Sequence, residues 1–220
     1  MQDFAEKVAV VTGAASGMGR AFAERFAREG MHVVLADIED AALEVAVGEL
    51  RTQGYEVLGV RTDVMRPEHV AALARQSLER FGKVHLVCNN AGVEGYLDGP
   101  LWEASDTDWA WTFGVNYWGV VNGVRAFLPI MLAQTEGGYL VNTSSATALV
   151  RGGNMYGITK HAVRALSEAL YVQLKQRGAP VGISVLCPGV VNTRLFDGER
   201  NRPAELRNPS AAYGCWGTTE

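Results

Sequence analysis

The chain has 220 residues, of which 48% are hydrophobic and 20% are charged, and its formal net charge is −4 at pH 7. This length suits one well-buried domain and leaves little room for a second. A nucleic-acid partner is not expected, because the sequence contains no basic run that could neutralise a row of phosphates. Small molecules are therefore the expected ligands.

The start of the chain is polar and acidic, whereas a secretory signal begins basic and continues apolar. No apolar run approaches the roughly 20 residues of a membrane-spanning helix, so a cytoplasmic protein without a membrane partner is expected. The three cysteines, Cys88, Cys187 and Cys215, are far apart and odd in number. Buried free thiols are expected rather than a metal site or a disulfide.

Six apolar runs of strand length alternate with segments in which apolar residues recur at helical intervals. The strand runs are apolar almost throughout, which is typical of a parallel sheet that is covered on both faces. The sequence therefore predicts an α/β fold, a single-domain, doubly wound (Rossmann-type) parallel sheet with helices on both faces. The predicted strands are residues 8–11, 33–36, 57–60, 84–88, 139–141 and 183–187.

A glycine-rich turn follows the first predicted strand, with Gly13, Gly17 and Gly19 set around Ser16 and Met18. Glycine lets the backbone approach a bound pyrophosphate, and the helix that begins here offers free N–H groups to an anion. Such turns also occur without a ligand, but a strand before and a helix after favour a dinucleotide.

An acidic residue, Asp37, ends the second predicted strand about 20 residues beyond the glycine turn, where it can accept hydrogen bonds from an adenosine ribose. A carboxylate there also repels the 2′-phosphate of NADP, and neither Ser16 nor Ile38 supplies a cation for that phosphate. NAD is therefore the expected cofactor. The alternative for Asp37 is a helix cap, because a helix follows directly.

The next two strands also end in polar residues. Asp63 and Val64 follow the third strand, and the run 89–92, Asn-Asn-Ala-Gly, follows the fourth. The carboxyl ends of parallel strands form the ligand crevice of an open sheet. Each segment alone would be consistent with a simple turn, but their succession favours a binding site.

Tyr156 and Lys160 lie four residues apart at the start of a helix with an apolar stripe, so their side chains project from one face. An ammonium about 4 Å from a phenol favours phenolate by ~4 kcal/mol at an effective dielectric of roughly 20, which would bring the pKa of the tyrosine from ~10 to about 7. Tyr156 is therefore expected to exchange a proton near neutral pH. The alternative is a pair that merely lies on a helix surface.

Together these motifs resemble the short-chain dehydrogenase/reductase family over about residues 7–195. The resemblance implies a dinucleotide-binding and catalytic Rossmann domain at residues 1–195, with residues 196–220 as a substrate-lid segment or partly disordered tail of the same domain. The motifs that carry it are Thr12-Gly13-x-x-x-Gly17-x-Gly19, Asn89-Asn90-Ala91-Gly92, Asn116, Ser145, Tyr156-x-x-x-Lys160 and Pro188-Gly189.

The resemblance implies catalytic roles for four residues. Tyr156 is expected to be the general acid/base, and Lys160 to lower its pKa and hold the nicotinamide ribose. Ser145 is expected to hydrogen-bond the substrate oxygen, and Asn116 to hold a water that connects Lys160 to solvent. Ser144 is the alternative to Ser145. Their hydroxyls would point opposite ways on a strand, and the family pattern Asn-x-Ser-Ser favours Ser145.

The resemblance also implies the cofactor contacts. Asp37 resembles the ribose-binding acid of NAD-preferring members, and Asp63 with Val64 resembles the pair beside the adenine. The segment after the sixth strand resembles the part that supports the nicotinamide. The full expected set is Gly13, Ser16, Gly17, Met18, Gly19, Asp37, Ile38, Asp63, Val64, Asn90, Ala91, Gly92, Tyr156, Lys160, Pro188, Gly189, Val191 and Thr193.

Residues outside the motifs have two interpretations. Arg194 is either a substrate contact or, more simply, an exposed arginine. His161 turns about 100° away from the catalytic face and is expected to be structural rather than a proton carrier. Trp111, Val115 and Trp118 share a helix face, which indicates either core packing or, as in family members, a dimer interface.

The C-terminal part departs from the family pattern. Family members with these motifs usually continue to a closing strand with an Asp-Gly-Gly-like turn, and nothing after Thr193 resembles it. The chain is either cut short or lacks this strand, which leaves the substrate lid, the sheet edge and one usual tetramer surface unassigned.

The leading functional hypothesis is an NAD-dependent short-chain alcohol dehydrogenase or carbonyl reductase, acting on a secondary alcohol or its ketone as a homodimer or homotetramer. One alternative is a non-catalytic dinucleotide-binding scaffold or sensor, and another is the longer sugar-nucleotide epimerase group, whose extra domain has no room here. Glu94 and Arg151 are the only charges expected along the substrate pocket before Arg194, which favours a neutral, moderately apolar substrate.

Overall fold

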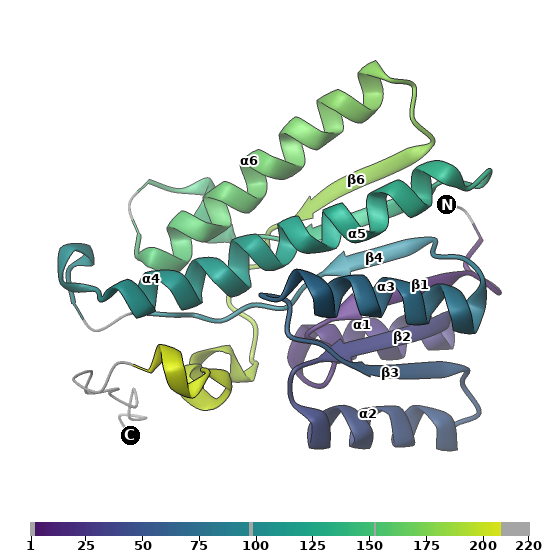
Figure 1. The fold of residues 1–220 in the computed structure, drawn as a ribbon, viewed down its shortest axis with the longest axis horizontal. Coiled ribbons are helices and arrows are strands. Elements are labelled where there is room, and N and C mark those ends of the chain that lie inside the picture. The colour runs from purple at the N-terminus through teal and green to yellow at the C-terminus, as the bar shows by residue number, and fades with distance from the viewer. Residues whose placement is uncertain (1–2, 97–98, 152, 208–220) are drawn as a thin grey trace.

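The computed structural model describes residues 3–96, 99–151 and 153–207. Within these residues, parallel strands form one six-stranded sheet in the order β3-β2-β1-β4-β5-β6 (Figure 1). The predicted α/β class and the doubly wound parallel sheet are confirmed. The strands are β1 (Val8–Thr12), β2 (His32–Asp37), β3 (Val57–Arg61), β4 (Leu86–Asn89), β5 (Gly138–Thr143) and β6 (Val181–Leu186).

Helices connect the strands, and all of these connections lead to a neighbouring parallel strand except the one from β3 to β4, which crosses over β2 and β1. None of those in the described part of the chain has the length and hydropathy needed to cross a membrane. The α-helices are α1 (Gly17–Arg28), α2 (Asp40–Thr52), α3 (Pro67–Phe81), α4 (Asp106–Phe113), α5 (Gly119–Ala133) and α6 (Met155–Gln176). The shorter turns are η1 (Leu101–Glu103), η2 (Gly114–Trp118), η3 (Ala146–Leu149), η4 (Arg194–Phe196), η5 (Gly198–Asn201) and η6 (Ala204–Leu206).

Different helices pack the two faces of the sheet. Leu73 of α3, Phe127 of α5 and Leu174 of α6 join one buried cluster with β-strand side chains. Ala23 of α1 and Leu43 of α2 join a second cluster on the opposite side. Full burial of a Leu or Phe side chain contributes about 1.5–3 kcal/mol, so these two layers hold the sheet rigid behind its loops.

The helix predicted over residues 107–132 is present, but it is interrupted in the middle. Here α4 and α5 are joined without a break by η2, a π-helical turn. A π turn places an extra residue in the helix and changes which side chains face inward after it. Asn116 lies within this turn and is fully buried.

The carboxyl ends of all six strands lie at one edge of the sheet, and the strand order reverses between β1 and β4. Such a switch point opens a crevice between the loops that leave the two strands. The segment 194–206, formed by η4, η5 and η6, returns to this edge and packs against α4 (Figure 1). Residues 208–220 of the predicted lid or tail lie outside the described residues.

Candidate active site

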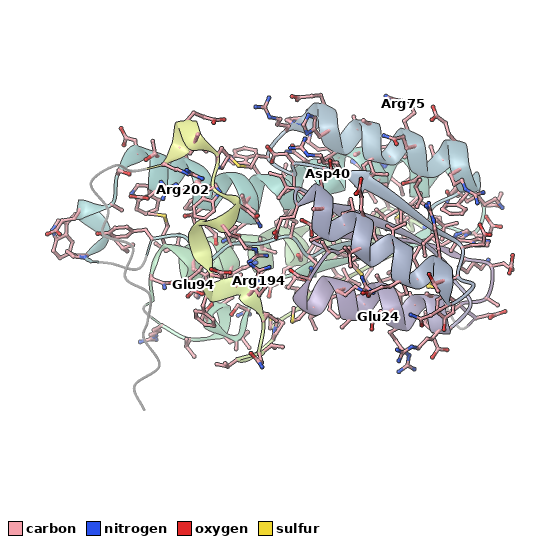
Figure 2. The ribbon with its side chains drawn as sticks, turned by 90° about the horizontal axis from the view of Figure 1, so that it is seen from below. Glu24, Asp40, Arg75, Glu94, Arg194 and Arg202 are labelled. Atoms are coloured by element: carbon pink, nitrogen blue, oxygen red, sulfur yellow. The ribbon has the colours of Figure 1, made fainter. Side chains whose placement is uncertain are left out.

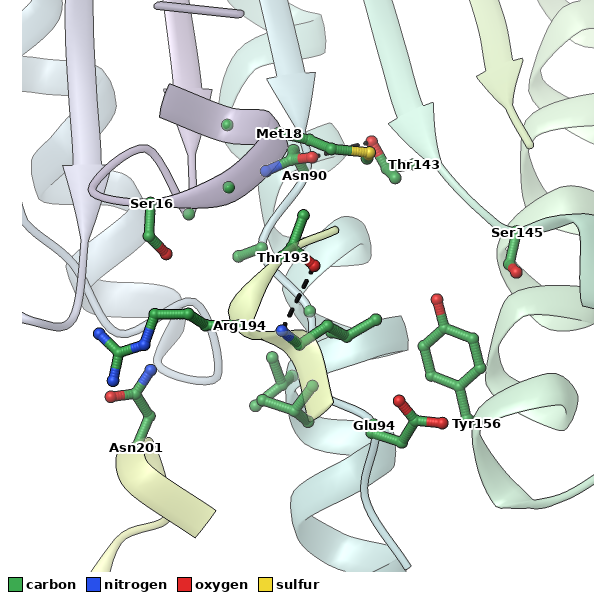
Figure 3. A pocket seen from close by; sticks show the side chains of 18 of the residues that line it. Ser16, Met18, Asn90, Glu94, Thr143, Ser145, Tyr156, Thr193, Arg194 and Asn201 are labelled. Atoms are coloured by element: carbon green, nitrogen blue, oxygen red, sulfur yellow. Dashed lines mark hydrogen bonds between the residues drawn. The ribbon is translucent and has the colours of Figure 1, made fainter. Parts of the chain in front are cut away.

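A cavity of about 360 Å³ lies at the carboxyl edge of the sheet, between the strand-end loops and the segment 194–206. Every residue of the expected cofactor set lines it, and so does Ser145 (Figure 3). Asn116 does not line the cavity but lies behind it. Residues spread over most of the sequence therefore form one site.

The glycine turn after β1 brings backbone close to backbone. Gly13 and Gly17 have positive φ angles of 66° and 55°, which L side chains rarely adopt. A Cβ on Gly19 would overlap the Gly13 carbonyl, and one on Gly13 would lie 2.9 Å from the Cα of Ala91. These positions leave a smooth backbone surface for a ligand.

The N-terminus of α1 has the chemistry of an anion site. Ser16 occupies the N-cap position but its side chain makes no capping hydrogen bond, and the first turn contains no acidic residue. The N–H groups at this end and the positive end of the helix dipole are thus available to a phosphate. This chemistry and the close glycine packing fit the pyrophosphate of a dinucleotide.

Asp37 ends β2 and is buried at the wall of the cavity. Its carboxylate accepts hydrogen bonds from the backbone N–H of Ala15 at 2.9 Å and of Glu39 at 3.0 Å. Burial raises the pKa of Asp37, and these hydrogen bonds oppose the rise. The N-cap of α2 is Glu39, so Asp37 does not occupy the cap position that was its alternative interpretation. Its remaining lone pairs can accept ribose hydroxyls.

Two strand-end loops are fastened together by Thr12. Its hydroxyl oxygen accepts hydrogen bonds from the backbone N–H of Asn90 at 2.9 Å and of Ala91 at 3.0 Å. The Asn90 side chain donates in return to the Thr12 carbonyl at 2.9 Å. Sequence reasoning noted Thr12 only as part of a motif, although it sets the distance between the two loops.

Asn116 holds the loop after β4 from behind. Its side chain accepts from the Val93 N–H and donates to the Val93 carbonyl, both at 2.8 Å, and also donates to the Thr159 hydroxyl at 3.1 Å. A Cβ added to Gly92 would lie 3.3 Å from both the Asn116 Oδ1 and the Lys160 Nζ. Asn116 and Lys160 therefore meet behind Gly92, while the expected water contact of Asn116 stays a prediction.

Helix α6 begins at Met155 because the Asn154 side chain caps it, accepting from the Gly157 N–H at 3.0 Å. Tyr156 and Lys160 follow one turn apart, and the Lys160 Nζ lies 5.3 Å from the centre of the Tyr156 ring. Lys160 is almost fully buried and donates to the Thr143 carbonyl at 3.0 Å. Burial lowers the pKa of Lys160 to about 8.

The expected lowering of the Tyr156 pKa by Lys160 is wrong for this arrangement. Burial raises the pKa of Tyr156, a hydrogen bond with Ser145 lowers it, and the charge of Glu94 raises it further. Lys160 is not among the causes of this shift, and its ammonium instead donates to the Thr143 carbonyl. The phenol is therefore protonated at neutral pH in the ligand-free site.

The two candidate serines have different environments. Ser144 donates to the Lys160 carbonyl at 2.7 Å and thereby ties β5 to α6. Ser145 accepts from the Thr147 N–H at 3.2 Å and hydrogen-bonds Tyr156. The geometry places Ser145, not Ser144, beside the phenol of Tyr156.

The segment 194–206 brings two arginines to the site that local motifs could not reveal. Arg200 pairs with Glu39 at 2.8 Å and lies 3.3 Å from the Ser16 hydroxyl. Burial would raise the pKa of Glu39, but hydrogen bonds from Arg200 and Asn201 hold it below its usual value. A cation from far along the chain thus lies beside Glu39 and Ser16, in the same cavity as Asp37.

The second arginine, Arg202, does not line the cavity itself but fastens the segment to α4 beside it. It forms a buried ion pair with Asp108 of α4 at 2.7 Å and lies 5.0 Å from the centre of the Trp111 ring. Figure 2 shows that Arg202 and Arg194 both come from the C-terminal segment, which crosses the same side of the molecule as Glu94. Arg194 is exposed and pairs with Asp197 at 2.9 Å.

The structure also shows where His161 and the two tryptophans lie, for which the sequence left two interpretations. His161 is exposed, and its Nδ1 lies 2.8 Å from the Gly157 carbonyl, away from the cavity. Trp111 is only 1% exposed whereas Trp118 is 53% exposed, so the predicted common face is divided by η2. Trp111 thus belongs to the packed interior, while a dimer interface at Trp118 stays a prediction.

Metal ligands are not grouped in the described part of the chain, where no three His, Cys, Asp or Glu side chains come together. Cys88 is a buried free thiol whose pKa is raised by burial to about 12. Cys187 is free and half-buried, and Cys215 lies outside the described residues.

With this geometry defined, comparison with known proteins assigns the family. A family model described as short chain dehydrogenase matches residues 7–204. A solved short-chain dehydrogenase/reductase from Burkholderia phymatum, in complex with NAD, is 52% identical with a TM-score of 0.93, and the match covers 96% of this chain and 75% of that one. The chain belongs to the short-chain dehydrogenase/reductase family of oxidoreductases, as the motifs predicted.

Curated relatives include dehydrogenases of different substrates. The 1-deoxy-11-beta-hydroxypentalenate dehydrogenase of Streptomyces exfoliatus is 42% identical over 194 residues, which cover 87% of this chain and 70% of that protein. The CLA biosynthesis dehydrogenase/reductase of Lactiplantibacillus plantarum is 34% identical over 215 residues, which cover 97% of this chain and 74% of that protein. The substrates of these relatives are diverse, so the family alone does not identify the substrate here.

Proposed function

We propose that this protein is an NAD(H)-dependent oxidoreductase that transfers a hydride between the nicotinamide and a secondary alcohol or its ketone, with Tyr156 as general acid/base. The observation that carries the proposal is that Tyr156 and Ser145 line the same cavity as every expected cofactor residue. The NAD bound in the Burkholderia phymatum structure supports the choice of cofactor.

Different residues of the cavity would bind different parts of the dinucleotide. The glycine turn and the N-terminus of α1 would hold the pyrophosphate, and Asp37 the adenosine ribose. Asp63 and Val64 would contact the adenine, and Pro188 to Thr193 would support the nicotinamide; residues of both segments line the cavity. The bound nicotinamide supplies the hydride acceptor or donor.

The proton follows a separate route through the side chains. During alcohol oxidation, the phenolate of Tyr156 would take the proton of the substrate hydroxyl, and during reduction the phenol would return it. Ser145 can donate a hydrogen bond to the same substrate oxygen while it accepts from Thr147. With a pKa of about 8, Lys160 is charged at neutral pH and able to stabilise a nearby phenolate once Tyr156 is deprotonated.

Tyr156→Phe tests the proposal because it removes the hydroxyl and keeps the ring. We expect kcat to fall by about 10²–10⁴-fold, the usual contribution of a general acid/base, while the Kd for NADH stays within about twofold of the wild-type value. The measurements are steady-state turnover with a panel of secondary alcohols and ketones, and titration of NADH fluorescence.

Tyr171→Phe is the matched control, since Tyr171 lies on the same helix and is exposed. It should leave both quantities unchanged. Wild-type turnover in Tyr156→Phe would refute the assignment, and NADH binding without turnover of any substrate in the wild type would favour the scaffold or sensor.

We also propose a homodimer or homotetramer, because large apolar side chains are exposed on neighbouring helices. Trp118 in η2 and Val172 on α6 are each about half exposed. A patch of this kind on a packed helix pair favours association with another protein surface. The molar mass from light scattering tests this proposal, and a monomer at micromolar concentration would contradict it.

A further inference from the structure

Glu94 stands out among the acidic side chains of the site. Of the described residues, three carry buried carboxyl groups: Asp37, Glu94 and Asp108. Asp37 is satisfied by two backbone N–H groups and Asp108 by Arg202. Glu94 is 8% exposed, and its Oε2 is buried without a hydrogen-bond partner among those residues.

The backbone on either side holds Glu94 in this position. The N–H and the carbonyl of Val93 are both bound by the Asn116 side chain. Gly95 has a φ of 77°, and a Cβ there would overlap the side chain of Thr112. The carboxyl is thus placed by its neighbours, although its Oε2 has no hydrogen-bond partner in the part of the chain that the structure describes.

The carboxyl faces the reacting end of the cavity. Glu94 lines the cavity with Tyr156 and Ser145, and Figure 3 shows it beside the Tyr156 ring. Burial is the main cause of the raised pKa of the Tyr156 phenol, and the charge of Glu94 adds to it. The nearby cavity wall is largely apolar and includes Trp111 and Phe196. Among the described residues that line the cavity, Glu94 and Thr147 have buried side-chain oxygens without a hydrogen-bond partner, and of these two only Glu94 can carry a charge.

A buried carboxyl without a partner costs free energy, so a native protein that keeps one usually uses it. A structural role is not indicated, because Glu94 ties no two elements together. Burial raises its pKa, which leaves a carboxyl that can accept a hydrogen bond and, when protonated, also donate one. The complementary ligand group is one with an O–H or N–H of its own.

We propose that Glu94 recognises a hydrogen-bond donor on the carbon next to the reacting carbinol, so that the enzyme prefers vicinal diols or amino alcohols, and the matching hydroxy or amino ketones, over alcohols with a single polar group. This inference rests on the proposed function, because it deepens the assignment of the same site. It adds a requirement for a second polar group to the neutral, moderately apolar substrate predicted from the sequence.

A series of three secondary alcohols tests the proposal: phenylethanediol, phenylethanolamine and phenylpropanol, which carry a hydroxyl, an amine or a methyl beside the carbinol. For wild type we expect kcat/KM with NAD to be at least about 10-fold higher for one or both donor-bearing compounds than for phenylpropanol, the value of one hydrogen bond to a carboxyl. In Glu94→Leu this ratio should fall to about 1.

Glu94→Gln separates the two donors, since an amide still binds a hydroxyl but no longer neutralises an ammonium. Retained preference for the diol identifies hydroxyl recognition, and loss of preference for the amine identifies recognition of a cation; either outcome supports the proposal. An unchanged ratio in Glu94→Leu, or a wild-type enzyme with no preference for either donor, would overturn it.

Two readouts keep this test independent of turnover. Binding of the three compounds to the enzyme with NADH, followed by NADH fluorescence, should show the same preference even in Tyr156→Phe, so failure of the acid/base assignment would not be mistaken for failure here.

Glu94→Gln should also melt no lower than wild type at pH 8, because no structural contact is lost. Glu44→Gln, on the exposed face of α2, is the control. A lower melting temperature only for Glu94→Gln, with unchanged binding preference, would mark a structural residue instead.

Discussion

The two ends of the cavity are built from different parts of the chain. The dinucleotide end is formed by loops that directly follow β1 to β4, so each residue is positioned by the strand before it. The substrate end is formed by Glu94, the α4 face with Trp111, and the segment 194–206. One end therefore depends on the strand-end loops alone, and the other also on a segment that folds back over the sheet.

The polar groups at the two ends also differ. At the dinucleotide end Thr12, Asn90 and Asp37 are already engaged with backbone groups, which fixes the geometry before any ligand binds. At the substrate end Glu94 has no such partner for its buried oxygen. The cofactor end is therefore preorganised before a ligand binds, whereas the carboxyl of Glu94 at the substrate end is left to bind the ligand.

The largest effect is expected where the C-terminal segment is fastened to α4. Arg202→Met leaves Asp108 buried without its ion-pair partner, which typically costs about 3–5 kcal/mol. We expect a clear fall in the free energy of unfolding and a higher KM for the alcohol, with little change in NADH affinity. Urea unfolding and steady-state kinetics measure these quantities.

Arg75→Met provides the comparison for that experiment. Arg75 pairs with Glu79 on the surface, with both side chains 65% exposed. Such surface pairs contribute about 0–1 kcal/mol, so no measurable change is expected. If Arg202→Met weakens NADH binding as much as it raises the alcohol KM, the two ends are not independent.

A smaller effect, confined to the dinucleotide end, is expected for Gly19→Ala. The new methyl would overlap the Gly13 carbonyl, and backbone cannot move aside as a flexible side chain can. We expect NADH affinity to fall by about 100-fold or more, equivalent to roughly 2.7 kcal/mol. Gly48→Ala is matched to it, because a Cβ on Gly48 of α2 meets nothing within 4 Å. Normal NADH binding by Gly19→Ala would show that the turn is not the pyrophosphate site.

The smallest effect concerns the choice of cofactor. Asp37→Ser removes the carboxylate that repels a 2′-phosphate and leaves Arg200 nearby. We expect kcat/KM with NAD to fall by about 10-fold, through loss of hydrogen bonds to a charged group, and that with NADP to rise. The ratio of the two values is the measurement. Asp40→Ser, at the exposed start of α2, should leave it unchanged.

The features that were predicted best from the sequence are those that depend on residues close together in the chain. The strands and the polar residues at their ends follow from local patterns, so the fold and the residues that share the cavity were predicted. The environment of Tyr156 was not, because the direction of the Lys160 ammonium depends on the Thr143 carbonyl of another strand. Spacing along a helix indicates proximity but not orientation.

The contacts of the C-terminal segment lay beyond such reasoning for a related physical reason. Arg202 meets Asp108, and Arg200 meets Glu39, across separations that no periodicity connects. Glu94 was recognised as a charge in the pocket, but its lack of a partner is visible only when all its neighbours are known. No sequence pattern predicts that a buried side chain lacks a hydrogen-bond partner.

The π turn η2 acts as a phase shift between two halves of one continuous helix. In a regular α-helix, residues seven apart differ by only about 20° in direction, so Trp111 and Trp118 would share a side. The offset separates them and lets α4 present Asp108 and Trp111 to the C-terminal segment while α5 keeps Phe127 in the core. Deleting one residue in η2 would restore a regular α-helix. Trp111 and Trp118 would then lie on the same side, so α4 could no longer face the C-terminal segment while α5 keeps its present packing in the core.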